Sequence, residues 1–197
     1  MSASGSTSGV PDYLQMPLGR FLAAVASGES APGGGAAAAV AVALAAGLAG
    51  MAARLSSGHL DGAEALAERA DRIREEVAPL ARADAEAFGR VLEAYRLPRE
   101  REDRPGRIRR ALGEAAAVPL EIAVRGAEAA RLASRLAGRG NPNLKGDAVA
   151  AVLLAEAGVR AAAELVRIND PEGERKQRAG RLVEDASGER QAVLGGS

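Results

Sequence analysis

The side chain best placed to move protons is the carboxylate of Asp84. It falls on the apolar stripe of a predicted helix, where Val77, Leu80, Phe88 and Val91 recur at spacings of three or four residues. We therefore expect this carboxylate to face inward. Because an unpaired buried carboxylate is unfavourable, Asp84 needs an arginine partner, backbone donors, a wet cleft or a raised pKa suited to proton transfer. A purely structural ion pair remains the alternative.

A glycine turn precedes the most apolar helix of the chain. Pro32, Gly33, Gly34 and Gly35 lead directly into a run of alanines. The free N–H groups of such a helix start could hold an anion or oxyanion, and the missing side chains would let a ligand approach closely. The turn lacks the Gly-Lys-Ser/Thr ending of a phosphate loop, which disfavours a nucleotide site. A flexible helix entry explains the same residues.

A second short loop concentrates polar side chains. Asn141, Asn143 and Lys145 follow Gly140, and Asp147 stands at the next predicted helix start. Loops of this kind often carry binding groups. In the structural alternative, Gly140 caps one helix, the asparagines form a turn and Asp147 is an N-cap.

One charged stripe has a simpler explanation. Glu156, Arg160, Glu164 and Arg167 lie four, four and three residues apart on an otherwise apolar helix. We expect structural ion pairs there, with capture of a ligand carboxylate as the alternative.

The composition excludes several classes of protein. The 197 residues contain 26 Lys+Arg, 26 Asp+Glu, one His and no Cys. A formal net charge of zero gives no electrostatic reason for binding nucleic acid. Without cysteine, and with one histidine, the chain has no thiolate nucleophile and no histidine metal cluster. Aromatic residues make up 2% of the chain, so we expect an aliphatic core on closely packed helices rather than a β-sandwich.

Apolar periodicity and breaker residues predict helices throughout the chain. The expected helices cover residues 17–28, 35–57, 61–95 with a kink at Pro79, 105–137 with a kink at Pro119, 147–168, and a short one near 174–184. We predict an all-α, up-and-down bundle of five or six helices with a buried Ala/Gly-rich central helix. Residues 1–14 form a disordered tail in this interpretation, residues 15–170 the helical domain, and residues 171–197 a polar segment.

The segment from Ser30 to Ala53 contains no charged residue, so a membrane span has to be weighed. Its Ala and Gly content, without aromatic anchors or a basic flank, favours a helix buried on all sides of a bundle. No signal or lipidation motif is present, and we expect no membrane association and a cytoplasmic protein.

Taken together, six short motifs resemble the cyclodeaminase/cyclohydrolase family. They are Ala-Ser-Gly-Glu-Ser-Ala-Pro-Gly-Gly-Gly at 26–35, Asp-Ala-Glu-Ala-Phe at 84–88, Val-Pro-Leu-Glu-Ile-Ala at 118–123, Gly-Asn-Pro-Asn at 140–143, Asp147-Ala148, and Val-Arg-Ile-Asn at 166–169. This family includes the C-terminal domain of formiminotransferase-cyclodeaminase and stand-alone methenyltetrahydrofolate cyclohydrolases. The resemblance covers about residues 17–170.

The resemblance implies an all-helical homodimer that acts on one-carbon forms of tetrahydrofolate, with no metal and no cofactor beyond the folate. By the same resemblance, the glycine turn and the asparagine loop form walls of the folate cleft, and Asp84 and Asp147 are its catalytic carboxylates. Asn141, Asn143 and Lys145 then contact the substrate. This chain has Ala36 and Gly146 where many members carry serine.

Two reactions fit these groups. In cyclodeamination, N10 of 5-formiminotetrahydrofolate attacks the formimino carbon and ammonia leaves, which needs a carboxyl group to move protons between nitrogens. In cyclohydrolase action, water adds to the methenyl carbon and 10-formyltetrahydrofolate forms, with a carboxylate as base and counter-charge. We slightly favour cyclodeamination. A non-catalytic helical dimerisation module is the alternative from another class.

Overall fold

The computed structural model describes residues 10–170 and 172–195, and over these ranges it contains helices and no strand. The α-helices are α1 (Leu18–Val25), α2 (Gly34–Arg54), α3 (Ala63–Val77), α4 (Leu80–Arg96), α5 (Arg104–Arg139), α6 (Lys145–Asn169) and α7 (Glu174–Leu194). Two 3₁₀ turns span Tyr13–Gln15 and Pro142–Leu144. The predicted all-α class is confirmed.

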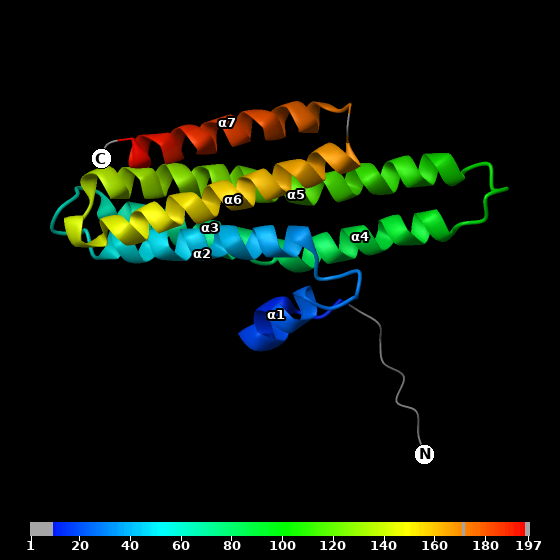
Figure 1. The fold of residues 1–197 in the computed structure, drawn as a ribbon, viewed down its shortest axis with the longest axis horizontal. Coiled ribbons are helices and arrows are strands. Elements are labelled where there is room, and N and C mark those ends of the chain that lie inside the picture. The colour runs from blue at the N-terminus through cyan, green and yellow to red at the C-terminus, as the bar shows by residue number, and fades with distance from the viewer. Residues whose placement is uncertain (1–9, 171, 196–197) are drawn as a thin grey trace, which may run out of the picture.

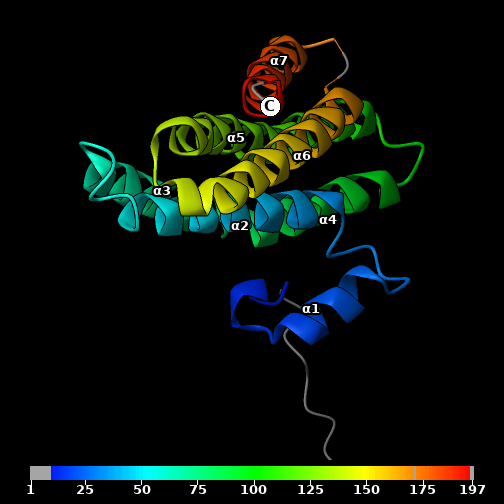
Figure 2. The ribbon, with the colours of Figure 1, turned by 60° about the vertical axis from the view of Figure 1, so that its left-hand side comes forward.

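Helices α2 to α7 run up and down along one long axis (Figure 1). Helices α3 and α4 follow one another along the length of α5, which has 36 residues and extends about 54 Å. Helix α6 lies between α2 and α5, and α7 covers α5 and α6 on one side. Helix α1 stands apart from the other helices, on the side of the bundle away from α7 (Figure 2). The predicted up-and-down bundle is therefore confirmed for α2 to α7.

Glycines let three helices cross at the centre of the bundle. A Cβ on Gly126 of α5 would lie 2.6 Å from Val159 Cγ2, and one on Gly158 of α6 would lie 2.6 Å from Val42 Cγ2. Both contacts are shorter than van der Waals packing allows, so only glycine fits at either position. Val42 and Val159 are fully buried there. The core has few large aromatic side chains, and it is filled instead because the backbones of α2, α5 and α6 pack closely together.

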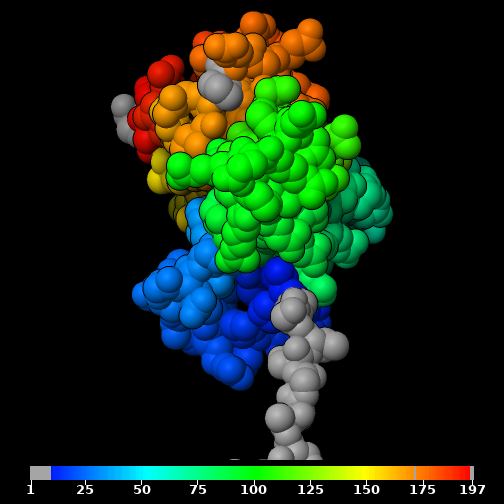
Figure 3. All heavy atoms as spheres, turned by 90° about the vertical axis from the view of Figure 1, so that its right-hand side faces the viewer, coloured from blue at the N-terminus to red at the C-terminus, as the bar shows by residue number. Residues whose placement is uncertain are grey.

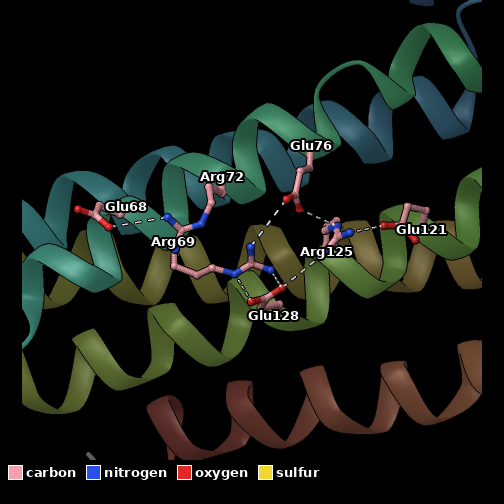
Figure 4. Close-up of polar contacts among 7 residues, drawn as sticks. All are labelled: Glu68, Arg69, Arg72, Glu76, Glu121, Arg125 and Glu128. Atoms are coloured by element: carbon pink, nitrogen blue, oxygen red, sulfur yellow. Dashed lines mark hydrogen bonds and ion pairs between the residues drawn. The ribbon is translucent and has the colours of Figure 1, made fainter.

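Ion pairs join α3 to α5 along the flank of the bundle (Figure 4). Arg69 binds Glu128 with two hydrogen bonds, Nε to Oε1 and Nη2 to Oε2, both 2.5 Å long. Arg125 lies 3.0 Å from Glu76 Oε2 and 2.6 Å from Glu121 Oε1. This network holds the sequence-distant helices in one register.

The two internal prolines act differently. Pro119 lies within α5, as predicted. Pro79 separates α3 from α4, although Ala78 and Pro79 both keep right-handed helical backbone angles. Because proline has no N–H to donate, the helical hydrogen-bond ladder stops at this point while the chain direction continues.

The C-terminal helix is longer than the sequence predicted. Helix α7 runs to Leu194 rather than to about residue 184, and Ala179 and Ala186 are buried against the bundle. Its polar composition hid this packing, because small alanines rather than large apolar residues form its buried face.

Tyr13 corrects the predicted boundary of the N-terminal tail. The tail prediction for residues 1–9 lies outside the described residues. Tyr13, which was assigned to the tail, is only 5% exposed and packs edge-on against Phe21 with ring centroids 5.8 Å apart. Tyr13 and Phe21 belong to the main hydrophobic core, so the segment from Tyr13 through α1 is attached to the bundle.

Helix α2 is the Ala/Gly-rich central helix, but it is not enclosed on every side. Its inward residues, such as Ala39, Val42 and Ala49, are fully buried. Ala37, Leu44 and Met51 are exposed, and Leu44 is 57% exposed. Among the described helices, α2 alone is long and apolar enough to cross a membrane, and 56% of its most apolar window is buried inside the bundle. That burial favours a core helix.

Candidate active site

A cavity of about 270 Å³ forms where α2 begins and α6 ends. The glycine turn at Gly33, Gly34 and Gly35 borders it on one side, and Asp84 from α4 borders it on another. The remaining lining residues are Ser30, Ala31, Ala85, Phe88, Ala115, Leu165, Ile168 and Asn169. Two features that lie about 50 residues apart in sequence therefore meet in one pocket, as predicted.

Gly35 and Asp84 fit together only because Gly35 has no side chain. A Cβ on Gly35 would lie 2.1 Å from Asp84 Cγ and 2.1 Å from Oδ1. The carboxylate is thus seated directly over the first turn of α2. The first N–H groups of an α-helix have no intrahelical acceptor and form the positive end of its dipole. A negative charge at Asp84 is therefore placed beside donors that a ligand can also use.

Burial controls the electrostatics of Asp84. Burial raises the pKa of this carboxyl from 3.8 to about 6. In residues 10–170 and 172–195, no ion pair or hydrogen bond engages its oxygens. The arginine partner of the structural alternative is therefore absent from the described chain. Burial also raises the pKa of Tyr13, with a further contribution from the negative charge of Asp84. A raised pKa without an ion-pair partner in the described residues is common for groups that transfer protons, so Asp84 is a candidate for that role.

The asparagine loop lies at the other end of α2. Asn141 Nδ2 donates to the Leu55 carbonyl over 3.1 Å, and the Asn141 N–H donates to Ser56 Oγ over 2.9 Å. Asn141 Oδ1 accepts from the Asn143 N–H at 3.0 Å. Since α2 has 21 residues, this end lies about 30 Å from Gly34. Within one chain, Asn141 has a structural role as a cap and bridge.

Asp147 and Lys145 are likewise remote from Asp84 in the single chain. Asp147 lies in the first turn of α6 and Asn169, at the other end of that helix, lines the pocket. The sequence separation of 22 residues corresponds to about 33 Å along the helix. Lys145 borders a separate cavity beside Gly138 and Val193, on the α7 side. The prediction of one pocket that holds both carboxylates and the loop is wrong for a single chain. Asp84 and the glycine turn lie at one end of the long helices, and Asp147 and the asparagine loop lie at the other end.

Other pocket residues were not singled out from the sequence. Asn169 and Ile168 end the Val-Arg-Ile-Asn motif, and Phe88 ends the Asp-Ala-Glu-Ala-Phe motif, so motif membership was the available signal. Tyr13 does not line this pocket, but the charge of Asp84 contributes to its raised pKa, and no motif in the sequence pointed to it. Ala36, whose missing hydroxyl the sequence flagged, is fully buried and does not line the pocket.

A larger groove of about 860 Å³ lies at the α4–α5 end, which faces the viewer in Figure 3. Its lining is mostly charged, with Arg109 and Glu93 among the contributors. On α4 it uses positions from Arg90 to Leu97, which point away from Asp84 by helical spacing. We therefore separate it from the Asp84 pocket. No group of three or more metal-ligating side chains occurs in the part of the chain that the structure describes.

The fold and the site define an all-α helical-bundle enzyme in which a half-buried carboxylate, without an ion-pair partner among the described residues, lies over the glycine-rich start of a helix. The chain belongs to the family described as formiminotransferase-cyclodeaminase, whose family model matches residues 17–187. A methenyltetrahydrofolate cyclohydrolase from Methylorubrum extorquens is 37% identical over 159 residues, which is 76% of each chain.

Two further comparisons agree with this assignment. Formimidoyltransferase-cyclodeaminase from Mus musculus is 34% identical over 166 residues, and the match covers 79% of this chain and 31% of that protein. The chain thus spans about a third of that longer relative. The crystal structure of formiminotetrahydrofolate cyclodeaminase from Thermotoga maritima superposes with a TM-score of 0.74 at 29% identity and covers 92% of each chain.

Proposed function

We propose that the chain acts on a one-carbon derivative of tetrahydrofolate in the Asp84 pocket, and that it hydrolyses the 5,10-methenyl form to the 10-formyl form. The observation that carries this proposal is the half-buried carboxylate of Asp84, with a pKa of about 6, beside the glycine turn. With that pKa the group is mainly ionised at pH 7 to 8, which is the form a general base needs. The similarity to a cyclohydrolase over 76% of both chains supports the same reaction.

The hydrolysis needs one base and one counter-charge. The methenyl carbon joins two nitrogens and carries a delocalised positive charge, which the Asp84 carboxylate stabilises. Asp84 removes a proton from the attacking water as the new C–O bond forms. The C–N5 bond then breaks, N5 receives a proton, and the former water oxygen becomes the formyl oxygen. One proton is released to solvent overall.

Cyclodeamination is the second candidate, and the sequence alone slightly favoured it. The similarity to a cyclodeaminase structure over 92% of each chain supports this reaction. Here the formimino group starts in its protonated form, and Asp84 would take the proton from N10 as N10 attacks the formimino carbon. Asp84 would return that proton to the formimino nitrogen, which leaves as ammonia when its bond to the carbon breaks. The first step produces the protonated acid that the second step needs, so a pKa of about 6 suits both steps.

The two reactions have opposite effects on the absorbance of methenyltetrahydrofolate, because hydrolysis consumes this compound and cyclodeamination forms it. Purified protein supplied with methenyltetrahydrofolate should consume that absorbance faster than the spontaneous reaction, and 5-formiminotetrahydrofolate should give no increase. The opposite result would establish cyclodeamination. Asp84→Asn should lower turnover by about 10²- to 10⁴-fold in either reaction, the range typical of a positioned acid or base. Near-normal turnover by this variant would overturn the role of Asp84.

A non-catalytic dimerisation module has weaker support. It rested on Ala36 and Gly146, yet Ala36 is buried away from the pocket and Gly146 contacts nothing within 4 Å of its Cβ position. Calorimetry separates this alternative, because a module without activity should show neither heat nor a shift in melting temperature with either folate.

We also propose a homodimer in the cytoplasm that uses no metal and no cofactor beyond its folate. The exposed apolar residues of α1 and α2 support self-association, because such patches are rare on monomers. Gel filtration at micromolar concentration tests the dimer, and activity after treatment with a chelator tests metal independence.

A further inference from the structure

The Asp84 pocket is too small and has too little positive charge to hold the whole of the proposed substrate. Its volume of about 270 Å³ is slightly below that of pockets that enclose drug-sized ligands. A folate ends in a glutamate whose carboxylates need cations or strong hydrogen-bond donors. No Lys or Arg lines the pocket, and Asp84 is the one charged side chain among its lining residues. The benzoyl and glutamate parts of a folate therefore have to lie outside this cavity.

An aromatic row on α4 leads out of the pocket. Phe88 lines the pocket and is 40% exposed, and Tyr95 is 50% exposed. Both lie within about 40° of Asp84 around the helix axis, so the three residues share one face of α4. The chain has two Phe, two Tyr and no Trp, and the other pair, Tyr13 and Phe21, pack against each other. The larger groove uses different positions of α4, which are Arg90, Glu93, Ala94 and Leu97.

The aromatic row ends at a cationic tip of the bundle, formed by residues 96–110. Helices α4 and α5 continue beyond the start of α2 and the end of α6, and these residues close that extension (Figure 1). The tip contains seven arginines and three acidic residues, which gives it a net charge of +4. The whole chain has a formal net charge of zero, so positive charge is concentrated at this end. Such a concentration attracts anions.

The arginines of the tip differ in what they already bind. Arg101 and Arg107 are neutralised by one shared aspartate. Arg104 donates to two carbonyls at the end of α4, which braces the turn between α4 and α5. Arg96 and Arg99 are exposed, and no ion pair or side-chain hydrogen bond engages them within residues 10–170 and 172–195. These two guanidinium groups, just beyond the aromatic row, are therefore available to an anion.

We propose that this face of α4 binds the tail of the folate substrate and favours a tail with more than one glutamate. The inference rests on the proposed function for the identity of the substrate. The p-aminobenzoyl ring stacks on Phe88, because aromatic faces pair with flat rings. The glutamate chain passes Tyr95, whose ring covers its methylene groups. Arg96 and Arg99 bind a carboxylate of the second, γ-linked glutamate, since the guanidinium group matches a carboxylate with two parallel hydrogen bonds.

The length of α4 determines which glutamate reaches the arginines. Arg96 is 12 residues beyond Asp84, which corresponds to about 18 Å along the helix. The reacting carbon lies at Asp84, so the tail has to cover this distance. A γ-linked glutamate has two more carbons in its main chain than an ordinary residue, and it therefore advances the tail by more than about 3.5 Å. The benzoyl group and two such glutamates cover the length from the pocket to the tip.

Kinetics with substrates that differ only in the length of the tail test the proposal. The wild type should have a KM for the triglutamate form of its folate about three- to tenfold below that for the monoglutamate, with similar kcat, because exposed ion pairs add modest uniform binding. Arg96→Gln combined with Arg99→Gln should raise the triglutamate KM to the monoglutamate value. Arg109→Gln combined with Arg110→Gln removes the same charge from exposed arginines of the separate groove, and this control should keep the difference.

Salt provides a second measurement on the same samples. About 1 M salt shortens the Debye length to about 3 Å, so it should reduce the difference in KM between the two tail lengths. Equal KM values for both tails in the wild type, or an equal loss of the difference in both double variants, would overturn the proposal. A difference that survives the change of Arg96 and Arg99 would place the tail elsewhere on the molecule.

A fragment without a reacting carbon separates this inference from the proposed function. In calorimetry, p-aminobenzoyl-triglutamate should bind the wild type more tightly than p-aminobenzoyl-glutamate, and Phe88→Leu should weaken binding of both fragments severalfold. A wild type that shows this order of binding but acts on neither folate would remove the proposed function and leave the tail site. Turnover of folate with no dependence on tail length would do the reverse. Displacement of the fragment by a similar concentration of inorganic phosphate would overturn glutamate recognition in favour of a general anion site.

Discussion

The raised pKa of Asp84 results from its position in the fold and not from a charged partner. Its spacing on α4 predicted that it faces inward, and the cavity beside Gly35 confirms this position. The sequence could not decide between an ion pair and a raised pKa, because that choice depends on which arginines reach α4 in space. In the structure Arg82, the nearest arginine in sequence, pairs with Glu86 instead.

The raised pKa of Asp84 has a consequence for stability that can be measured. Burial raises its pKa to about 6 in the folded chain, against about 3.9 when unfolded. The folded state therefore binds the proton more tightly, and stability is lost as pH rises from about 4 through 6. Asp84→Asn should match the wild type near pH 4 and exceed it by up to about 3 kcal/mol at pH 7. Urea unfolding at both pH values measures this, and parallel curves would contradict it.

Gly35 provides a second test at the residue scale. Gly35→Ala places a methyl group where the Asp84 carboxylate now lies, so the carboxylate has to move. We expect turnover to fall at least tenfold, because positioning errors of about 1 Å can lower rates by 10²-fold. Gly180→Ala on α7 is the matched control, since nothing lies within 4 Å of its Cβ position. There the added methyl should raise stability by roughly 0.5–1 kcal/mol. Unchanged turnover in Gly35→Ala would show that the carboxylate position is not critical.

At the element scale, helix existence could be predicted from periodicity, but the partners of each helix could not. The apolar stripe of α6 gave its extent to within two residues. Helix α7 was underestimated because its attachment depends on one buried charge of α6. Glu156 accepts hydrogen bonds from Arg160 and Arg190 at 3.0 Å and from Ser187 at 3.1 Å. No local pattern connects residues 156, 187 and 190.

Removing Glu156 should therefore loosen α7. Burial alone would raise the pKa of Glu156, but the hydrogen bonds from Arg160, Arg190 and Ser187 together lower it. Glu156→Ala should cost roughly 1–3 kcal/mol, because several charged hydrogen bonds lose their acceptor. Glu164→Ala removes an exposed pair with Arg167 on the same helix and should leave stability nearly unchanged. Urea unfolding measures both. Equal losses of stability in the two variants would mean that the buried contacts of Glu156 stabilise the fold no more than the exposed pair of Glu164.

At the scale of the whole molecule, the motifs named from the sequence divide between two ends of the bundle. The order of motifs along the chain indicated a shared site, but sequence order carries no information on which end of an antiparallel helix a loop occupies. Gly35 and Asp84 lie at one end, and Asn141 is hydrogen-bonded to Leu55 at the other. A long helix such as α2 keeps these ends about 30 Å apart.

The two asparagines of the loop therefore should respond differently to the same substitution. Asn141→Ala loses the hydrogen bond to the Leu55 carbonyl and the one from the Asn143 N–H, so stability should fall by about 1–2 kcal/mol. Asn143→Ala keeps its backbone N–H and is exposed, so its melting temperature should match the wild type. If Asn143 contacts the substrate, its loss should instead raise KM or lower kcat severalfold. Thermal unfolding and kinetics on the same samples separate these effects. Normal kinetics for Asn143→Ala in a stable dimer would mean that the loop stabilises the chain end and takes no part in catalysis.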